Sequence, residues 1–238
     1  MFEGRRVLVV VPARGGSQGV KLKNLREVGG VSLVGRAGDV VKALDFVDRA
    51  IVSTDHPEIA RVAKQHGLDA PFMRPEDLSG PIVSDWQVLT HALREVEKRD
   101  GLTYDILVML QPTSPSRTPE HVRATVDKLV KGGFDAVWTV SETDSKGHPL
   151  KQFRIGPNGS LDYYDPAGAK IIARQQLQPV YHRNGVAYAI TRSCLLDQGT
   201  IYGAKTGALL IEGELANIDT ELDLIWANFL FDRERSKA

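Results

Sequence analysis

Hydrophobic positions along the chain follow two alternating patterns. Short runs of aliphatic and β-branched residues predict strands, and longer segments whose apolar positions recur every three or four residues predict helices. The predicted strands are 6–11, 49–53, 106–110 and 136–140, and the predicted helices are 33–44, 57–66, 85–99 and 119–131. Their alternation along the chain predicts an α/β fold with a doubly wound, mostly parallel, Rossmann-like sheet.

The pattern changes after residue 140. Glycine and proline become frequent in 141–180 and separate short strands there. We interpret 141–180 as a small inserted hairpin subdomain, and residues 1–140 and 181–238 as the core domain. The core resumes with a strand at 185–190 and closes with a helix at 221–235. The apolar residues of this helix share one face, namely Leu222, Ile225, Trp226, Phe229 and Leu230.

The charge and cysteine content argue against several classes of protein. The 30 basic and 30 acidic residues cancel, so no overall positive field favours nucleic acid or an anionic membrane. The single cysteine, Cys194, excludes an internal disulfide and fits a reducing compartment. The apolar run 7–11 is too short for a signal-peptide core or a membrane span, and no later stretch is long enough. We therefore expect a cytoplasmic protein with no nucleic-acid or membrane partner.

The segment 12–24, directly after the first strand, has the composition of a phosphate-binding loop. Its glycines allow successive backbone N–H groups to converge on an anion, and its cations add positive charge. The residues concerned are Arg14, Gly15, Gly16, Ser17, Gly19, Lys21 and Lys23. The segment is neither a Walker A loop nor the dinucleotide-binding Gly-x-Gly-x-x-Gly turn. Glycine spacing alone is also typical of a flexible surface turn, but the flanking cations favour a triphosphate.

The whole segment resembles the N-terminal signature of the CMP-sialic acid synthetase family, the acylneuraminate cytidylyltransferases. Further blocks resemble that family in the same order, at residues 52–55, 74–78, 110–118, 174–177, 184–185 and 218–223. Several spaced blocks are more specific than any single one, and together they span nearly the whole chain. The resemblance implies a CTP-dependent nucleotidyltransferase. Its reaction would transfer CMP from CTP to the anomeric hydroxyl of a nonulosonic keto-sugar acid and release pyrophosphate.

Nucleotide-binding residues follow from the same resemblance. They are Ala13, Arg14, Gly15, Gly16, Ser17, Lys23, Asn24, Arg74 and Ser84. Arginine can grip phosphate oxygens or base acceptors with a planar fork, and the amide of Asn24 offers both a donor and an acceptor. Standing alone, Arg74 would be interpreted as a solvated loop arginine.

Sugar-acid residues are assigned in the same way to Gln111, Lys151, Arg174 and Tyr188. Gln111 follows a buried strand, so it is expected at the carboxyl edge of the sheet, where open α/β folds bind their ligands. A purely structural turn is the alternative for this proline-flanked residue. Arg174 would counter carboxylate or phosphate charge, and Tyr188 would wall the pocket. Lys151 fits an exposed hairpin lysine equally well.

Catalysis in such an enzyme consists of alignment and charge neutralisation. The resemblance implies Arg14, Lys23 and Asp219 as catalytic residues, and Asp219 with Asn217 as ligands of Mg²⁺ or Mn²⁺. A helix-capping aspartate is the alternative for Asp219. The family pattern here is Asp-Ile-Asp, so Asn217 replaces a carboxylate by a neutral amide, and Gln18 likewise replaces a lysine.

The resemblance also implies a homodimer, with the 141–180 hairpins reaching across. The acid stays open, since sialic, legionaminic and pseudaminic types all fit. Two other functions compete with this one. The first is a nucleotidyltransferase for another acid or phosphate-bearing sugar. The second is a nucleotide-binding regulatory relative with weakened catalysis, which Asn217 and Gln18 suggest.

Overall fold

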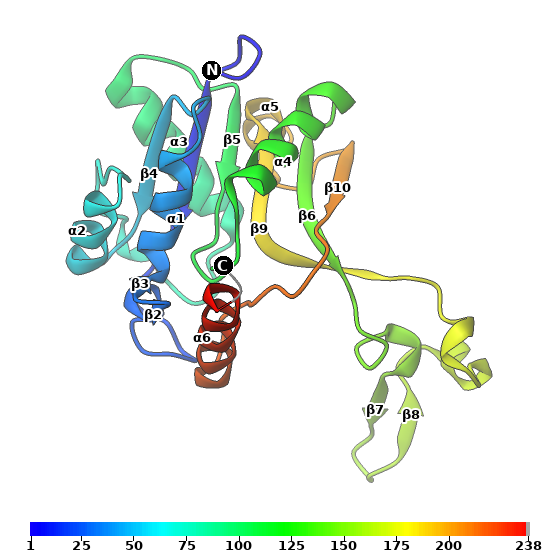
Figure 1. The fold of residues 1–238 in the computed structure, drawn as a ribbon. Coiled ribbons are helices and arrows are strands. Elements are labelled where there is room, and N and C mark those ends of the chain that lie inside the picture. Colours follow the sequence, from blue (N-terminus) through cyan, green and yellow to red (C-terminus); the bar gives the residue numbers. More distant parts are fainter. Residues whose placement is uncertain (237–238) are drawn as a thin grey trace. The chain divides into compact units, whose positions relative to one another are not determined.

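The computed structural model describes residues 1–236 and has a six-stranded central sheet (Figure 1). The strand order is β10-β6-β9-β5-β1-β4. Their bounds are Val7–Pro12 (β1), Arg49–Ser53 (β4), Ile106–Met109 (β5), Ala136–Glu142 (β6), Tyr181–Thr191 (β9) and Thr206–Leu210 (β10). β1 pairs in parallel with both β4 and β5, and β5 pairs antiparallel with β9. The predicted fold class is confirmed.

Helices cover both faces of this sheet. The helices are Leu33–Lys42 (α1), Pro57–Gln65 (α2), Asp85–Asp100 (α3), Pro119–Gly132 (α4), Arg192–Leu196 (α5) and Glu221–Arg235 (α6). Alternate residues of β1 enter two different cores. Val7, Val9 and Val11 pack with residues of α1, α2 and α4, whereas Leu8 and Val10 pack with residues of α3 and α5. This alternation is the pleat of a strand buried on both faces.

Three loops leave the sheet at one edge. Because β1, β4 and β5 are parallel, the segments that follow them, which begin at Ala13, Thr54 and Leu110, lie at the carboxyl edge. The loop after β1 ends in the short 3₁₀ helix η1 (Lys23–Leu25) and the two-stranded ribbon of β2 (Glu27–Val28) and β3 (Val31–Ser32). The fold therefore gathers the predicted nucleotide loop and Gln111 at the same edge.

The closing helix α6 buries a different face from the one its strongest apolar residues suggest. Leu224, Ala227 and Leu230 are buried, in a cluster that includes Val20 and Val28. Four of the five residues on the predicted face are instead exposed: Leu222, Ile225, Trp226 and Phe229. α6 thus packs against the end of the nucleotide loop and the β2–β3 ribbon, and this packing fixes the segment that precedes it.

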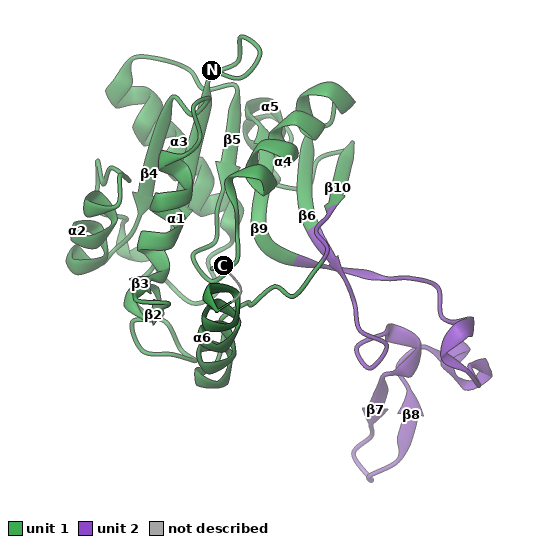
Figure 2. Cartoon of the chain, viewed as in Figure 1, with its two compact units in different colours: residues 1–139, 184–209, 213–238 green, residues 140–183, 210–212 purple. Residues whose placement is uncertain are grey.

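The chain divides into two compact units (Figure 2). Unit 1 comprises 1–139, 184–209 and 213–238, and unit 2 comprises 140–183 and 210–212. Unit 2 contains the predicted insertion, and its elements are η3 (Pro149–Lys151), β7 (Phe153–Ile155), β8 (Leu161–Tyr163), η4 (Pro166–Lys170) and η5 (Arg174–Gln176). Among the described residues, no helix is both long and apolar enough to cross a membrane.

Candidate active site

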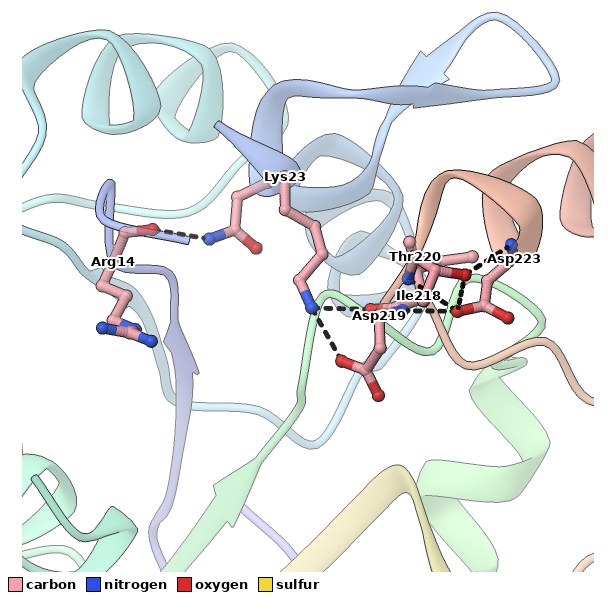
Figure 3. A network of polar contacts seen from close by, with 7 residues as sticks. Arg14, Lys23, Ile218, Asp219, Thr220 and Asp223 are labelled. Carbon is pink, nitrogen blue, oxygen red and sulfur yellow. Dashed lines mark hydrogen bonds and ion pairs between the residues drawn. The ribbon is translucent and has the colours of Figure 1, made fainter. Parts of the chain in front are cut away.

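The predicted phosphate loop is tethered at both ends to neighbouring strands and turns. Ala13 N–H donates to the carbonyl of Ser53, and Gly15 N–H donates to the Asp55 carboxylate at 2.8 Å. The buried amide of Asn24 donates to the carbonyl of Arg14 at 2.9 Å (Figure 3). These bonds fix the entry and exit of the loop and leave its middle exposed.

Two glycines of the loop are required by close packing. A Cβ on Gly15 would lie 2.9 Å from the ring of His56. A Cβ on Gly19 would lie 2.2 Å from the carbonyl oxygen of Asp219, closer than any side chain tolerates. The loop therefore approaches the Asp219 segment backbone to backbone, which no flexible surface turn would need.

Lys23 and Asp219 form the central ion pair of the site. Lys23 Nζ donates to Asp219 Oδ1 at 2.8 Å and to the carbonyl of Ile218 at 2.7 Å (Figure 3). The Lys23 side chain is mostly buried, whereas the Asp219 side chain is 71% exposed. A lysine of η1 is thus held against a carboxylate that remains open to solvent.

Asp219 does not cap α6, so the capping alternative is wrong. The N-cap is Thr220, which forms a capping box with Asp223. Partial burial alone would raise the pKa of Asp223, but the amides of Asp219 and Thr220 donate to its carboxylate and hold that pKa below its ordinary value. The cap is complete without the Asp219 side chain, which stays available for a ligand.

The possible metal ligands near Asp219 are too few to hold an ion by protein groups alone. They suit a metal ion that is also bound by a substrate. Asn217 is exposed and follows the buried Ala216. Within residues 1–236, no group of three or more His, Cys, Asp or Glu side chains could hold a metal ion. Mg²⁺ commonly binds one or two carboxylates and completes its shell with water and phosphate oxygens. One open carboxylate beside a phosphate loop is consistent with that arrangement.

Arg74 is buried against Ser53, whose carbonyl also accepts from Ala13 N–H of the phosphate loop, so its interpretation as a solvated loop arginine is wrong. Its side chain is 6% exposed and donates to Ser53 Oγ at 3.1 Å and to the Ser53 carbonyl. Desolvation lowers the pKa of Arg74 to about 10, an effect that nearby Asp55 opposes and nearby Arg14 increases. Arg74 and Arg14 therefore add positive charge to the same region.

Ser84, the remaining predicted nucleotide residue, is the N-cap of α3. Its hydroxyl accepts from Gln87 N–H at 3.3 Å and donates to Gln87 Oε1 at 2.9 Å in a capping box. A direct contact between Ser84 and the nucleotide stays a prediction.

The predicted sugar-acid residues are divided between the two units. In unit 1, Gln111 follows β5, and Tyr188 is buried with its hydroxyl accepting from Gly185 N–H at 3.2 Å. The ring of Tyr188 packs edge-on against Trp138. Tyr188 therefore supports the segment beneath Gln111 and does not present an open wall. In unit 2, Lys151 and Arg174 both line a pocket of about 140 Å³.

Three further residues of the site were not singled out from the sequence. Asp55 holds Gly15, His56 packs against the same glycine, and Arg117 is bonded to the carbonyl of Gln111. Asp55 and Arg117 stand inside blocks that resemble the family, which was the available signal. Asp55 and Gly15 are 40 positions apart, and Arg117 also bonds to carbonyls 68 and 69 positions away, so these contacts needed the fold.

Fold and site together define a class of enzyme. A cationic phosphate loop at the carboxyl edge of a doubly wound sheet, facing an open carboxylate, is the arrangement of a nucleotidyltransferase. The sequence model of a family described as Cytidylyltransferase matches residues 8–225. The chain belongs to this cytidylyltransferase family.

Curated relatives include three enzymes that form CMP-sugars. A CMP-N,N'-diacetyllegionaminic acid synthase of Legionella pneumophila is 31% identical, over 93% of this chain and 94% of its own length. A pseudaminic acid cytidylyltransferase of Campylobacter jejuni is 25% identical, over 94% and 95% respectively. N-acylneuraminate cytidylyltransferase A of Danio rerio is 28% identical over 94% of this chain and 50% of its own length.

Solved structures share the fold. A CMP:2-keto-3-deoxy-manno-octonic acid synthetase complexed with CTP superposes with a TM-score of 0.69 at 17% identity, covering 96% of this chain and 99% of that one. A 4-diphosphocytidyl-2C-methyl-D-erythritol synthase of Anaerococcus prevotii gives a TM-score of 0.65 at 16% identity, covering 97% and 100%. The predicted class of enzyme and its CTP dependence are confirmed by the family.

Proposed function

We propose that this chain transfers CMP from CTP to the anomeric hydroxyl of a sialic-type keto-sugar acid. The observation that carries the proposal is the approach of the phosphate loop to Asp219, with Lys23 bonded to its carboxylate at 2.8 Å. This contact joins the lysine that we propose to bind phosphate and the carboxylate that we propose to bind the metal ion. The similarity to the legionaminic acid synthase, 31% identical over 93% of the chain, supports an acid of that type.

The reaction is a displacement at phosphorus. The anomeric oxygen of the acid bonds to the α-phosphorus of CTP, the bond from that phosphorus to the bridging oxygen breaks, and pyrophosphate leaves with those electrons. The hydroxyl proton passes to solvent. Because no covalent protein intermediate is required, the protein contributes alignment and charge neutralisation.

Arg14, Lys23 and the loop amides are proposed to neutralise the triphosphate. Lys23 can exchange its bond to Asp219 for phosphate oxygens as the nucleotide enters. Asp219, with Asn217 as a weaker neutral ligand, would hold Mg²⁺. The ion would supply charge neutralisation on the triphosphate when bound.

The sugar-acid substrate is also proposed to bind to positively charged side chains. Lys151 and Arg174 place two positive charges at the unit 2 pocket, whose other lining residues are mostly apolar. This combination suits the carboxylate and the acyl groups of a nonulosonic acid.

Unit 2 is further proposed to join two copies of the chain. Six of its apolar residues are at least half exposed: Phe153, Ile155, Leu161, Tyr164, Ile172 and Tyr181. The aromatic side chains among them bury roughly 150–250 Å² each when fully covered, and the aliphatic ones add to this area. The set therefore offers an area of the order that one side of a standard interface uses, about 800 Å².

A cytoplasmic location likewise stays a prediction.

Pyrophosphate release with a panel of acids tests the function. The chain is incubated with CTP, Mg²⁺ and, in turn, neuraminic, legionaminic, pseudaminic and 3-deoxy-octulosonic acids. Release that requires one of the first three acids supports the proposal. Tight CTP binding without release across the panel would favour the regulatory alternative, and release only with the octulosonic acid would assign a different substrate class.

A further inference from the structure

A buried arginine replaces the strand ladder where β5 ends. β5 pairs with β9 as far as Met109 opposite Tyr188. Beyond that pair, the guanidinium of Arg117 donates to the carbonyls of Gln111 at 2.6 Å, of Gly185 at 3.0 Å, and of Val186. One planar group thus joins the second residue after β5 to two residues of β9, through donors on two separate nitrogens that lysine lacks.

This arginine is buried without a carboxylate. Its side chain is 6% exposed, and in the part of the chain that the structure describes its hydrogen bonds all go to carbonyl oxygens. Burial lowers the pKa of Arg117 to about 9, which reflects the cost of placing a cation among neutral partners. A neutral residue of similar size would fill this space without the free-energy cost of burying a charge. We therefore attribute the presence of arginine here to the several hydrogen bonds that its guanidinium donates.

The backbone that Arg117 holds also sets the position of the Gln111 amide. A Cβ on Gly185 would lie 2.5 Å from Gln111 Oε1 and 2.6 Å from Ser114 Oγ. The amide of Gln111 therefore packs directly on the Cα of Gly185, whose φ is +74°. Ser114 Oγ adds a bond of 2.8 Å to the carbonyl of Asn184. Displacing this stretch of β9 would move the Gln111 side chain with it.

We propose that Arg117 is a positioning residue that holds Gln111 in the orientation needed to bind the acid substrate. The proposal rests on the proposed function, because it takes Gln111 as a contact of that acid. Arg117 touches no substrate itself. It acts by fixing the carbonyl of Gln111 and the Gly185 surface on which the Gln111 amide lies.

The test is a double-mutant cycle between Arg117→Lys and Gln111→Ala, with kinetics measured separately for the acid and for CTP. Loss of the fork should lower kcat/KM for the acid on the order of 10- to 100-fold, because ångström-scale misplacement has effects of that size. The Kd for CTP should stay within twofold. In the Gln111→Ala background, Arg117→Lys should change kcat/KM less than threefold, since its effect passes through Gln111.

Arg49→Lys is the matched control. Arg49 is the first residue of β4, at the end of the strand away from the carboxyl edge, and it pairs with Asp69 and Asp100. It should leave all kinetic constants unchanged. If Arg117→Lys fails to fold, Ser114→Ala takes its place in the cycle with a smaller effect in the same direction. Unchanged kcat/KM in the folded single variant, or full additivity in the cycle, would overturn the inference. Wild-type chain without activity on any acid would instead overturn the proposed function.

Discussion

At the scale of single residues, the site depends on one carboxylate that the fold leaves open. Asp219 is 71% exposed, and the capping of α6 is carried by Thr220 and Asp223. Its ion pair with Lys23 joins residues 196 positions apart in the chain. An exposed aspartate of this kind contributes little to stability, which separates its functional role from a structural one.

Replacing Asp219 by alanine should therefore remove activity while sparing the fold. We expect kcat to fall on the order of 100-fold or more through loss of the metal-binding charge. The free energy of unfolding should change by no more than about 0.5 kcal/mol, as for other surface substitutions. Steady-state kinetics and urea unfolding measure the two effects.

Glu221→Ala is the control for this experiment, since Glu221 is also an exposed carboxylate of the same segment and pairs with Arg26 at 2.7 Å. It should keep near-normal turnover. Near-normal turnover in Asp219→Ala would show that the metal assignment is wrong.

The sequence indicated the roles of residues that are neighbours in the chain, but not the roles that depend on contacts between distant segments. The loop 12–24 has its glycines and cations next to one another, so its chemistry was visible. The burial of Arg74 and the three carbonyl bonds of Arg117 depend on strands that are brought together only by folding. The same holds for Tyr188, whose ring was expected to face a pocket and is buried against Trp138.

At the scale of elements, local signals located most helices and strands. β4 and α6 have the predicted bounds, because a β-branched run and a capped amphipathic segment are local properties. β10 and α5 were missed: β10 spans five residues and contains a glycine, and α5 is a single short turn. The buried face of α6 was also missed, since it is chosen by contacts with Val20 and Val28.

One helix cap makes stability depend on pH. In the capping box of α4, His121 Nδ1 accepts from Thr118 N–H at 3.3 Å, which requires a neutral ring. Burial lowers the pKa of His121, with Glu120 opposing and Arg117 adding to the shift. Because the unfolded chain then binds a proton more readily than the folded chain, the free energy of unfolding should fall as pH drops through about 6.5.

The variant His121→Gln tests this linkage. Glutamine keeps the acceptor of the capping box and does not titrate. Denaturant unfolding at pH 7.5 and at pH 5.5 should show a smaller loss of stability in the variant than in the wild-type chain. An equal loss in both would mean that His121 makes no contribution to the pH dependence.

At the scale of the whole molecule, the chain consists of two units. Unit 1 contains the predicted nucleotide loop, and unit 2 is small and has little hydrophobic core of its own. Unit 2 buries few of its side chains and exposes a set of large apolar ones. The boundaries of such an insertion follow from glycine and proline content, whereas the return of 210–212 to unit 2 had no local signal. This exposed apolar set is the basis for the interaction surface that we propose on unit 2.

We expect the chain to be a dimer in solution, joined through unit 2. Ile155→Asp, at a site 78% exposed, should produce monomers with an unchanged Kd for CTP, as measured by sedimentation equilibrium and calorimetry. Leu102→Asp, a partly exposed position of unit 1, should leave the dimer intact. Dissociation by Ile225→Asp on the exposed face of α6, with Ile155→Asp still dimeric, would place the interface on α6 instead.

Identification of the reaction products tests whether the chain transfers CMP. The chain is mixed with one nucleoside triphosphate at a time, Mg²⁺ and the acid that gives the fastest pyrophosphate release, and the products are identified by mass spectrometry. We predict a CMP–acid conjugate and pyrophosphate in equal amounts from CTP, with at least tenfold slower reaction from ATP, GTP or UTP. A conjugate that forms equally fast from another triphosphate, or pyrophosphate without any conjugate, would show that the chain is not a CTP-specific CMP transferase.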